Sequence, residues 1–322
     1  MGRIVRLLAD HATVVVSGTK IADEVGVSRS AVWRMVQQLR ALGVNITGHP
    51  TTGYALARAA DLLLPEYLAP QLKGTIFAGR IHHYFRTEST NALALDAASR
   101  GEPEGSVFLA EEQTAGRGRG GNHWHSEKSA GIYCSVILRP QLPPADALSL
   151  SLIAGLAVQQ AVKQVTGLSA DLRWPNDLML NDKKFCGILT EMNAEPTRVR
   201  YAVTGIGVNV NHAAFPARLR DTATSLRLES GHEWPRSALA VALLQSLDYE
   251  YRALSSDAVS GILRRFEQNS SYARGKKVRV EEEGGFEGVT DGLDARGFLR
   301  VRTADGMRTV LSGSVRPLAS QD

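Results

Sequence analysis

Residues 111–124 read EEQTAGRGRGGNHW, with four glycines and two arginines in positions 116–121. Glycine lets the backbone turn tightly and come close to a ligand. Arginine carries a permanent charge and a planar set of donors that matches a carboxylate or a phosphate. Apolar, strand-like segments flank the stretch at residues 106–110 and 132–138. The pattern therefore predicts an anion-binding loop between two strands of a packed domain.

Other interpretations of this stretch compete with an anion-binding loop. Gly116, Gly118 and Gly121 match the G-x-G-x-x-G dinucleotide motif, but that motif opens a helix, and residues 123–131 have no helical period. Disordered arginine–glycine tracts that bind RNA are long and repeated, whereas this one is short and embedded. A plain surface hairpin stays open. We favour the anion-binding loop because loop residues with specific chemistry usually carry function.

The chain of 322 residues, 43% hydrophobic and 22% charged, has the composition of a soluble globular protein with two or three domains. No apolar run approaches membrane-spanning length, and the N-terminus leads into a short amphipathic segment and not a signal peptide. Cys134 and Cys186 lie in apolar, strand-like runs, which predicts buried free thiols in a reducing compartment. We therefore expect a cytoplasmic protein without a membrane partner.

The net charge of +4 is confined to the first part of the chain. Residues 1–60 hold seven basic and three acidic side chains, and the remainder is neutral overall. A small basic module suggests a polyanionic partner, and DNA is the leading candidate. The alternative is a helical protein-interaction module, which the basic excess makes the weaker hypothesis.

Residues 19–43 have the pattern of a helix-turn-helix. Thr19 can cap a short helix that runs to residue 25, Gly26 makes the turn, and Ser28 caps a second helix that ends at Gly43. The buried stripe of the second helix is expected to consist of Val32, Val36 and Leu39.

Segments 44–47 and 53–56 resemble the two strands of a wing, which would complete a winged helix-turn-helix. Side chains at the start of the second helix would project outward and meet base edges and phosphates. Trp33 can equally be partly core. The candidate DNA-binding residues are Arg29, Ser30, Trp33, Arg34 and Gln37.

Beyond residue 60 we expect a linker over residues 61–74, with a helical turn or two, and a mixed domain over residues 75–272. Strands in runs with few alternating helices argue for an α+β domain over a doubly wound sheet. Strands are expected at 81–85, 106–111, 132–139, 171–174, 185–192 and 199–210, and helices at 91–100, 145–166, 236–254 and 257–268. Residues 273–322 predict a small all-β barrel with strands at 276–282, 285–290, 298–302 and 308–311.

Two segments between the predicted strands carry candidate chemistry. Residues 173–177, Arg-Trp-Pro-Asn-Asp, end a strand at a proline. The Asn–Asp pair can bind a magnesium ion or a ribose through oxygen ligands, or form a simple Asx turn, and both interpretations remain open. Residues 181–184 look like a hairpin tip, where Lys184 starts a buried strand and can point inward at an anion. Lys183 fits an ordinary solvated turn lysine.

Gly205 and Gly207 stand at alternate positions of a predicted strand, where glycine weakens packing unless another group approaches closely. Asn209 on the same strand could read the edge of a base. Residues 89–91, Ser-Thr-Asn, are expected at a helix start, either as a plain cap or as a pocket corner for a polar head group. The sequence has no Walker A pattern and no recognisable Ser/His/Asp array, so nucleotide chemistry would need a different anion clamp.

Together these segments resemble the bifunctional biotin–protein ligases that also repress the biotin biosynthetic operon. The similarity covers almost the whole chain. It rests on motifs in the family's order and spacing, which are residues 88–91, 113–119 with Trp124, 173–177, Lys184 with 187–189, and 205–209. It implies a winged helix-turn-helix, a central mixed α/β ligase domain resembling class II synthetases, and a small SH3-like C-terminal barrel.

The resemblance also implies a reaction. Biotin and Mg-ATP would give biotinyl-5′-AMP, which would acylate a lysine of a biotin carboxyl carrier protein. Operator DNA and, when the adenylate is bound, a second copy of the chain are the other implied partners. A carboxylate attacking a phosphate brings two anions together, so the site must supply positive charge.

The resemblance assigns roles to individual residues. Arg117, Arg119 and Lys184 would supply the positive charge, and Arg119 would close over the adenylate. Asp177 would be a further catalytic residue and a magnesium ligand. The residues implied for biotin are Ser89, Thr90, Asn91, Gln113, Gly116, Arg117, Gly118, Arg119, Lys184, Gly187 and Leu189. Those implied for ATP and the adenylate are Arg119, Trp124, Asn176, Gly207 and Asn209.

The sequence departs from the family's usual pattern at six positions, with Gly120, Asn122 and His123 where basic residues are frequent, Glu127 and Ser129 in place of Pro and Gly, and Arg173 in place of Lys. Two other functions compete with the ligase. One is a transcription factor that senses biotin without ligase activity, and adenylate formation would distinguish it. The other is a lipoate–protein ligase, against which the winged helix and the Arg-Trp-Pro-Asn-Asp segment argue.

Overall fold

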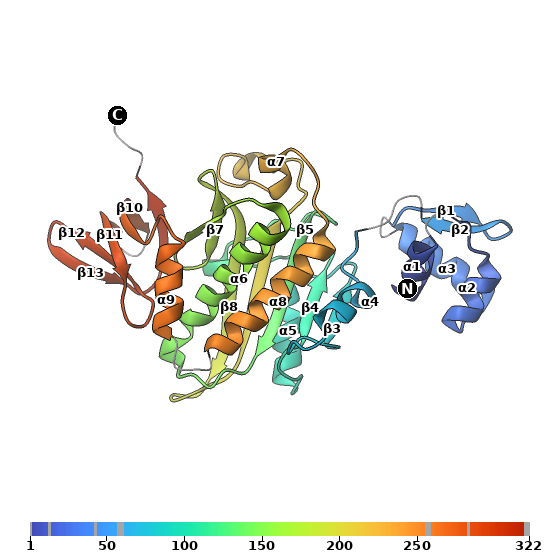
Figure 1. Ribbon diagram of the computed structural model, residues 1–322, viewed down its shortest axis with the longest axis horizontal. Helices are drawn as coiled ribbons and strands as arrows, with labels where there is room; N and C mark the ends of the chain where they lie inside the picture. The colour runs from blue at the N-terminus through green and yellow to red at the C-terminus, as the bar shows by residue number, and fades with distance from the viewer. Residues whose placement is uncertain are drawn as a thin grey trace.

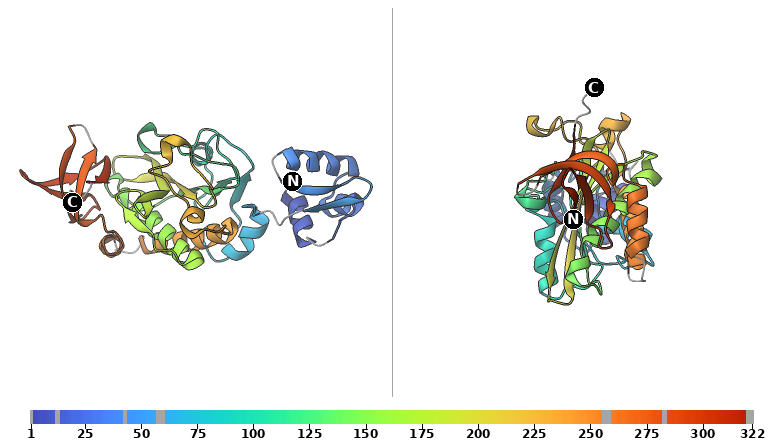
Figure 2. Two further views of the ribbon diagram at one scale, coloured as in Figure 1. Left: turned by 90° about the horizontal axis from the view of Figure 1, so that it is seen from above. Right: turned by 90° about the vertical axis from the view of Figure 1, so that its left-hand side faces the viewer.

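The computed structural model of the chain describes residues 2–11, 14–41, 44–56, 61–254, 259–281 and 284–318. Three modules follow one another along the long axis of the molecule (Figure 1). The N-terminal module, in blue, and the C-terminal sheet, in red, lie at opposite ends of the central domain (Figure 2). The order of modules is the one predicted from the sequence.

The N-terminal module is a helix-turn-helix with a two-stranded wing. Its elements are α1 (Gly2–Asp10), α2 (Gly18–Val25), α3 (Arg29–Ala41), β1 (Ile46–His49) and β2 (Gly53–Leu56). The predicted stripe of Val32, Val36 and Leu39 is fully buried in the module's core.

The caps of α2 and α3 agree with the predictions except at one position. Ser17, and not Thr19, caps α2, because Ser17 has extended backbone and its hydroxyl accepts from the N–H of Lys20. Gly26 ends α2 in the left-handed region with φ 75°, as a turn glycine should. Ser28 accepts from the N–H of residue 31 at 3.2 Å and so caps α3. The predicted end of the second helix at Gly43 lies outside the described residues.

A seven-stranded mixed sheet forms the central domain. Its strands are β3 (Ile81–Tyr84), β4 (Val107–Ala110), β5 (Gly131–Leu138), β6 (Asp171–Arg173), β7 (Asp177–Leu180), β8 (Lys183–Ala194) and β9 (Val199–Asn209). They lie in the order β3-β4-β5-β9-β8-β7-β6, with only the β3–β4 pair parallel. The α+β prediction is therefore confirmed. Strand β7 was not predicted, because it begins only two residues after Pro175 and has four residues.

Helices cover both faces of this sheet. Helix α5 (Thr90–Ser99) packs on β4, β5 and β9. The long helices α6 (Leu148–Thr166) and α8 (Arg236–Leu254) lie side by side across the other face, as Figure 1 shows. The segment Pro144–Thr166 is long and apolar enough to span a membrane, but 72% of its most apolar window is buried in the protein, so α6 is a core helix.

Shorter elements complete the central domain. They are α4 (Pro65–Leu68), α7 (Leu226–Ser230), α9 (Val259–Gln268) and the 3₁₀ turns Ala69–Leu72, Arg119–Gly121, Pro144–Asp146 and Ala217–Leu219. Cys134 and Cys186 are buried free thiols, as predicted. Burial raises the pKa of Cys134 to about 12 and raises that of Cys186 as well.

The C-terminal module is an antiparallel sheet of five strands. They are β10 (Arg274–Glu281), β11 (Phe286–Leu293), β12 (Leu299–Thr303), β13 (Gly306–Val310) and β14 (Ser314–Pro317), in the order β13-β12-β11-β10-β14. Among the described residues no pair joins β13 to β14, so closure into a barrel stays a prediction. Strand β14 was not predicted, because it is short and ends in a proline. The indole N–H of Trp174 donates to the Gly297 carbonyl at 2.8 Å and ties this module to the central domain.

The linker after the N-terminal module is anchored by a buried ionic network. Its predicted helical turns are α4 and the 3₁₀ turn that follows. Glu111, at the end of β4, accepts from the backbone N–H of Leu63 and from His83, and pairs with Arg236 at 2.8 Å. Arg236 also bonds to Asp61. The first residue of the glycine-rich stretch thus holds the chain that leads to the N-terminal module.

Candidate active site

The site is built on the face of the sheet that carries α5, at a point where the central strand lacks side chains. Gly205 of β9 pairs with Ser135 of β5 and Leu189 of β8. Asn91 of α5 lies directly over it, and a Cβ atom at Gly205 would overlap the Asn91 amide oxygen. Ser135 donates to that oxygen at 2.6 Å, and the amide nitrogen donates to Glu191 at 2.9 Å. The close approach that alternate glycines predict is therefore present.

The start of α5 and the glycine-rich stretch meet in a chain of hydrogen bonds. The Ser89 hydroxyl caps α5 by accepting from the N–H of Ala92. Both the N–H and the hydroxyl of Thr90 donate to the Gln113 side-chain oxygen, at 2.8 and 3.1 Å. The Gln113 amide nitrogen donates in turn to Ser126 at 2.9 Å. These polar groups are thereby held in fixed positions at one end of a cavity.

The Trp124 indole lies over the next glycine position of β9 and the residue of β8 that pairs with it. Gly207 of β9 pairs with Gly187 of β8. A Cβ atom would be 2.5 Å from Trp124 Nε1 at Gly207, and 2.9 Å from Trp124 Cζ3 at Gly187. The Lys184 ammonium lies 5.5 Å from the centre of the indole ring. The buried indole nitrogen has no hydrogen-bond partner among the described residues.

Lys184 is held at the site by a carboxylate. Its ammonium lies 2.6 Å from Asp177 Oδ1, while Arg173 lies 2.7 Å from Asp177 Oδ2. Burial by itself would raise the pKa of Asp177, but the charges of Lys184 and Arg173 outweigh burial and hold the pKa below its usual range. Asp177 is therefore an ionised counter-ion that positions two cations.

Arg119 reaches across the site from the glycine-rich loop. Its guanidinium donates to the Asn176 side-chain oxygen at 3.0 Å, and Asn176 is fixed by donating to the Ile188 carbonyl at 2.8 Å. Burial lowers the pKa of Arg119, and the Asp177 charge opposes that effect. Arg117 is exposed at the mouth of the site.

These side chains line two adjoining cavities that share Trp124 and Lys184. The first holds about 450 Å³ of empty space including its open mouth. It is lined by Ser89, Thr90, Asn91, Gln113, Arg117, Gly118, Arg119, Trp124, Asn176, Lys184, Gly187, Leu189 and Gly207, among others. The second is lined by Asp177, Asn209 and residues of the C-terminal module. Of the predicted biotin residues only Gly116 lies behind the first cavity wall, where a Cβ atom would be 2.6 Å from the Trp124 carbonyl oxygen.

Sequence reasoning missed several side chains that support or line the site. Ser126 and Ser135 hold Gln113 and Asn91 through their hydroxyls. Tyr133 lines the first cavity, and Arg316 of β14 lines the second. A lone serine or arginine in a strand carries no pattern that would single it out, so only the folded chain reveals these residues.

The predicted DNA-binding residues share one surface of the N-terminal module. Arg29, Ser30, Trp33 and Arg34 are exposed along α3, while Gln37 is half-buried. Trp33 is 46% exposed, so it is not a fully buried core residue, and its being partly core stays open. Arg29 donates to the carbonyl of residue 50 at 3.2 Å, at the turn of the wing.

Three family models match the chain in the order of its modules. They are "HTH domain" over residues 2–55, "Biotin/lipoate A/B protein ligase family" over residues 84–210, and "Biotin protein ligase C terminal domain" over residues 275–316.

Relatives match over nearly the full length. The bifunctional ligase/repressor BirA of Bacillus subtilis is 34% identical over 317 residues, which are 97% of each chain. BirA of Escherichia coli is 28% identical over 93% of this chain and 92% of its own. The structure of a biotin protein ligase from Aquifex aeolicus in complex with biotin and ATP superposes with a TM-score of 0.66 at 28% identity. It covers 74% of this chain and 100% of the Aquifex chain. The protein therefore belongs to the family of BirA-type bifunctional biotin ligases and repressors.

Proposed function

We propose that this ligase carries out both half-reactions at the junction of the two cavities, where Lys184 and Trp124 belong to both walls. One observation carries this assignment, namely that the two cavities meet at a lysine held in place by the half-buried carboxylate of Asp177. Two substrates bound in the two cavities would bring their reacting groups together at Lys184.

The first cavity is the candidate biotin site. A ureido ring offers one carbonyl acceptor and two N–H donors, and the closed end of the cavity presents the hydroxyls and amides of Ser89, Thr90, Asn91 and Gln113. Their mutual hydrogen bonds fix the orientation of each group before a ligand arrives. Leu189 and the strand glycines that line the cavity would face the apolar part of the ligand. The biotin carboxylate would then point toward Lys184.

The second cavity is the candidate nucleotide site. Asn209 has a buried side-chain oxygen without a hydrogen-bond partner in the described structure, while its amide nitrogen is held by the Thr224 carbonyl at 3.1 Å. A free acceptor of this kind fits the exocyclic amine of adenine. Trp124, which lines both cavities, offers a ring face, while the side-chain amide of Asn176 lines the first cavity. Arg316 brings a cation from the C-terminal module to the same cavity.

In the first step, an oxygen of the biotin carboxylate attacks the α-phosphorus of ATP, the bond to the β-phosphate breaks, and pyrophosphate leaves. Lys184 and Arg119 would stabilise the negative charge that gathers on the phosphate, with Arg117 at the mouth. In the second step the amine of the carrier lysine attacks the acyl carbon, AMP leaves, and the amine loses a proton. Asp177 would act by holding Lys184 in position.

Magnesium commonly accompanies ATP, and Asp177 is the candidate ligand from the sequence. The carboxylate does not fit that role as it stands, because Arg173 and Lys184 occupy its two oxygens. Magnesium usually keeps several waters and binds through substrate phosphates with one or two carboxylates.

The proposal also covers DNA binding, dimerisation, the domain boundaries and the location of the protein. The exposed face of α3 would bind operator DNA, and two copies joined in the adenylate-bound state would cover two half-sites. The proposed boundaries are residues 1–60, 61–74, 75–272 and 273–322, with the central domain of the class II synthetase type and the last module curled into an SH3-like barrel. Buried free thiols support a cytoplasmic location.

The test is incubation of the purified chain with ATP, biotin and a biotin carboxyl carrier domain. The carrier should gain the mass of one biotinyl group, and a carrier whose acceptor lysine is replaced by arginine should gain none. Lipoic acid in place of biotin should give no transfer. Absence of both adenylate and carrier modification would contradict the ligase assignment and leave only a biotin-sensing repressor.

A further inference from the structure

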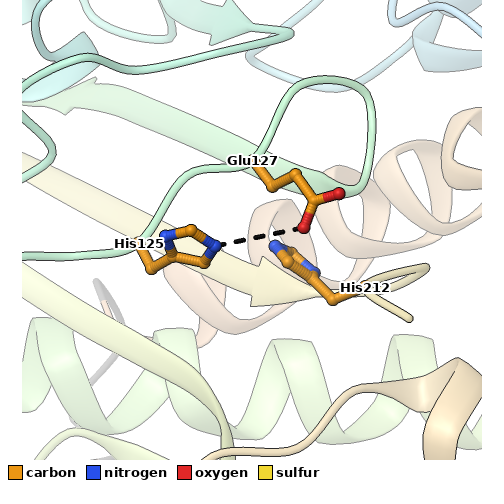
Figure 3. Close-up of side chains that lie close together, drawn as sticks. All are labelled: His125, Glu127 and His212. Carbon is orange, nitrogen blue, oxygen red and sulfur yellow. Dashed lines mark ion pairs between the residues drawn. The ribbon is translucent and has the colours of Figure 1, made fainter. Parts of the chain in front are cut away.

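Three side chains that commonly bind metals lie together and have no role in the proposed ligase reaction, although one of them, His125, lines the second cavity. His125 and Glu127 follow the glycine-rich loop, and His212 follows β9, more than 80 residues away in the chain. One ligand atom of each lies within 4.8 Å of those of the other two. Figure 3 shows the two imidazoles and the carboxylate converging from different segments. Within the described parts of the chain, no other group of three such side chains comes this close.

His212 has the surroundings of a metal-binding imidazole. Its side chain is fully buried, and Nε2 lies 3.3 Å from the Tyr133 hydroxyl. That hydroxyl donates to the Glu127 carbonyl at 2.7 Å, so it can accept from the ring. Nδ1 is buried and has no hydrogen-bond partner among the described residues. One ring nitrogen anchored by a protein group is typical of histidines that bind metals, and a buried unpartnered nitrogen is uncommon otherwise.

The neighbouring charges are compatible with a bound cation. Arg236 is a permanent cation whose charge acts on His212, and its guanidinium lies 2.8 Å from Glu111, which neutralises it. Glu127 brings a negative charge to the group, with its carboxylate 4.0 Å from His125 Nε2. Burial lowers the pKa of His212 to about 3, and the charges of His125 and Arg236 act in the same direction.

We propose that His125, Glu127 and His212 bind one divalent transition-metal ion of the Zn²⁺ class. Two imidazole nitrogens and one carboxylate oxygen form a donor set that suits Zn²⁺, Co²⁺ or Ni²⁺, whereas Mg²⁺ prefers oxygen donors. Two ligands at ~2.1 Å from a tetrahedral ion are about 3.4 Å apart, so the group must contract by about an ångström. His125 and Glu127 can move, since their side chains are 30% and 50% exposed.

The bound ion would tie two walls of the site together. It joins the segment that follows Trp124 to the turn that follows β9. His125 lines the second cavity, and the ring of His212 stacks on Phe215, which also lines it.

The test uses the full chain without a histidine tag, freed of metal by chelation, and titrated with CoCl₂. One Co²⁺ per chain should give visible absorption bands typical of a four- or five-coordinate site. Equimolar ZnCl₂ should remove the bands, while a large excess of MgCl₂ should not. Zn²⁺ should also raise the midpoint of thermal unfolding of the wild-type chain.

Variants of the two exposed ligands separate this site from adventitious binding. His125→Ala and Glu127→Gln should each weaken Co²⁺ binding by on the order of 10–100-fold or more. Both side chains are partly exposed, so the variants should keep the metal-free unfolding midpoint of the wild type. His82 forms a similar pair with Glu102 at 3.0 Å, without a third ligand among the described residues, and His82→Ala is the matched control that should bind Co²⁺ normally.

Two outcomes would overturn the metal site. The first is a wild-type chain without cobalt bands or zinc-dependent stabilisation. The second is a spectrum that survives both His125→Ala and Glu127→Gln, which would place the bound ion elsewhere. Loss of Co²⁺ binding in His82→Ala, with binding retained in His125→Ala and Glu127→Gln, would likewise contradict the proposed metal site.

Discussion

A Cβ atom at Gly207 would lie 2.5 Å from Nε1 of Trp124, so the indole rests directly on the backbone of β9. Trp124 also lines both cavities and lies beside Lys184. The position of this ring therefore depends on the absence of a side chain at one strand position. A methyl group there must displace the ring, because the β9 backbone is fixed between β5 and β8.

Gly207→Ala should reduce adenylate formation by on the order of 10²-fold, the usual cost of misplacing a reacting group by about an ångström. Pyrophosphate release measures this step. Gly261→Ala is the matched control, because its Cβ would meet only the tip of Arg264 at 3.9 Å and it lies in helix α9. Equal activity of Gly207→Ala and the control would show that the indole can shift without consequence.

Lys184→Ala should lower the rate of adenylate formation by about 10²–10³-fold, because a preorganised cation is removed from the phosphate. The neighbouring Lys183→Ala should stay close to wild type, since Lys183 lines neither cavity. Single-turnover rates with ATP and biotin give the comparison. Unfolding curves check that Lys184→Ala still folds, because this variant leaves Asp177 without one of its two cationic partners. Near-normal adenylation by Lys184→Ala would remove it from the catalytic assignment.

Arg119→Gly should still form the adenylate but release it, because the guanidinium no longer bridges the site to Asn176. Free adenylate acylates exposed lysines without selection. The measurement is the biotin incorporated into serum albumin relative to the carrier domain, and this ratio should rise well above the wild-type value. A variant that binds neither ATP nor biotin would instead assign Arg119 to substrate binding and not to closure.

Replacing Arg29 and Arg34 by alanine should weaken binding to biotin-operator DNA and leave carrier biotinylation unchanged. The slope of log K against log salt should flatten by about one for each phosphate that the variant no longer neutralises. Arg6→Ala is the control, because Arg6 lies on α1 and pairs with Asp10 at 3.6 Å. Gel-shift titrations with and without biotin and ATP measure both effects. If the wild type gives no shift even at low salt, the module has a different partner.

Glu111→Gln should destabilise the chain at neutral pH by about 3–5 kcal/mol, because it breaks a buried pair with Arg236. Burial alone would raise the pKa of Glu111, but His83, Arg236 and the Leu63 N–H together hold it below the usual value. A depressed folded-state pKa stabilises the fold above the unfolded pKa of about 4.3, and this stabilisation is lost as pH falls through the folded value.

Urea midpoints at pH 7 and below pH 4 test the Glu111 prediction. The difference between wild type and Glu111→Gln should be large at pH 7 and shrink in acid. Glu112→Gln is the control, since Glu112 pairs with Arg86 at 3.5 Å near the surface and should contribute less than about 1 kcal/mol. A constant difference at all pH values would mean that the ionised form of Glu111 is not what stabilises the fold.

Local patterns in the sequence determined the elements and the order of the modules. The helix-turn-helix was predictable because caps, Gly26 and the stripe on α3 depend on residues a few positions apart. Helix α8 was also predicted with its observed bounds, Arg236–Leu254. The exception at α2 arose because Ser17 and Thr19 are both good caps, and only backbone geometry decides between them.

The tertiary structure alone decided how these elements meet. Strand register places Gly205 beside Ser135 and Gly207 beside Gly187, and register depends on pairing between strands far apart in sequence. Pairing of the neighbouring short strands β6, β7 and β8 sets Asp177 between two cations, where the sequence left a metal ligand and an Asx turn open. The His125, Glu127 and His212 group is invisible in sequence, because no local spacing links a loop to the end of a strand more than 80 residues later.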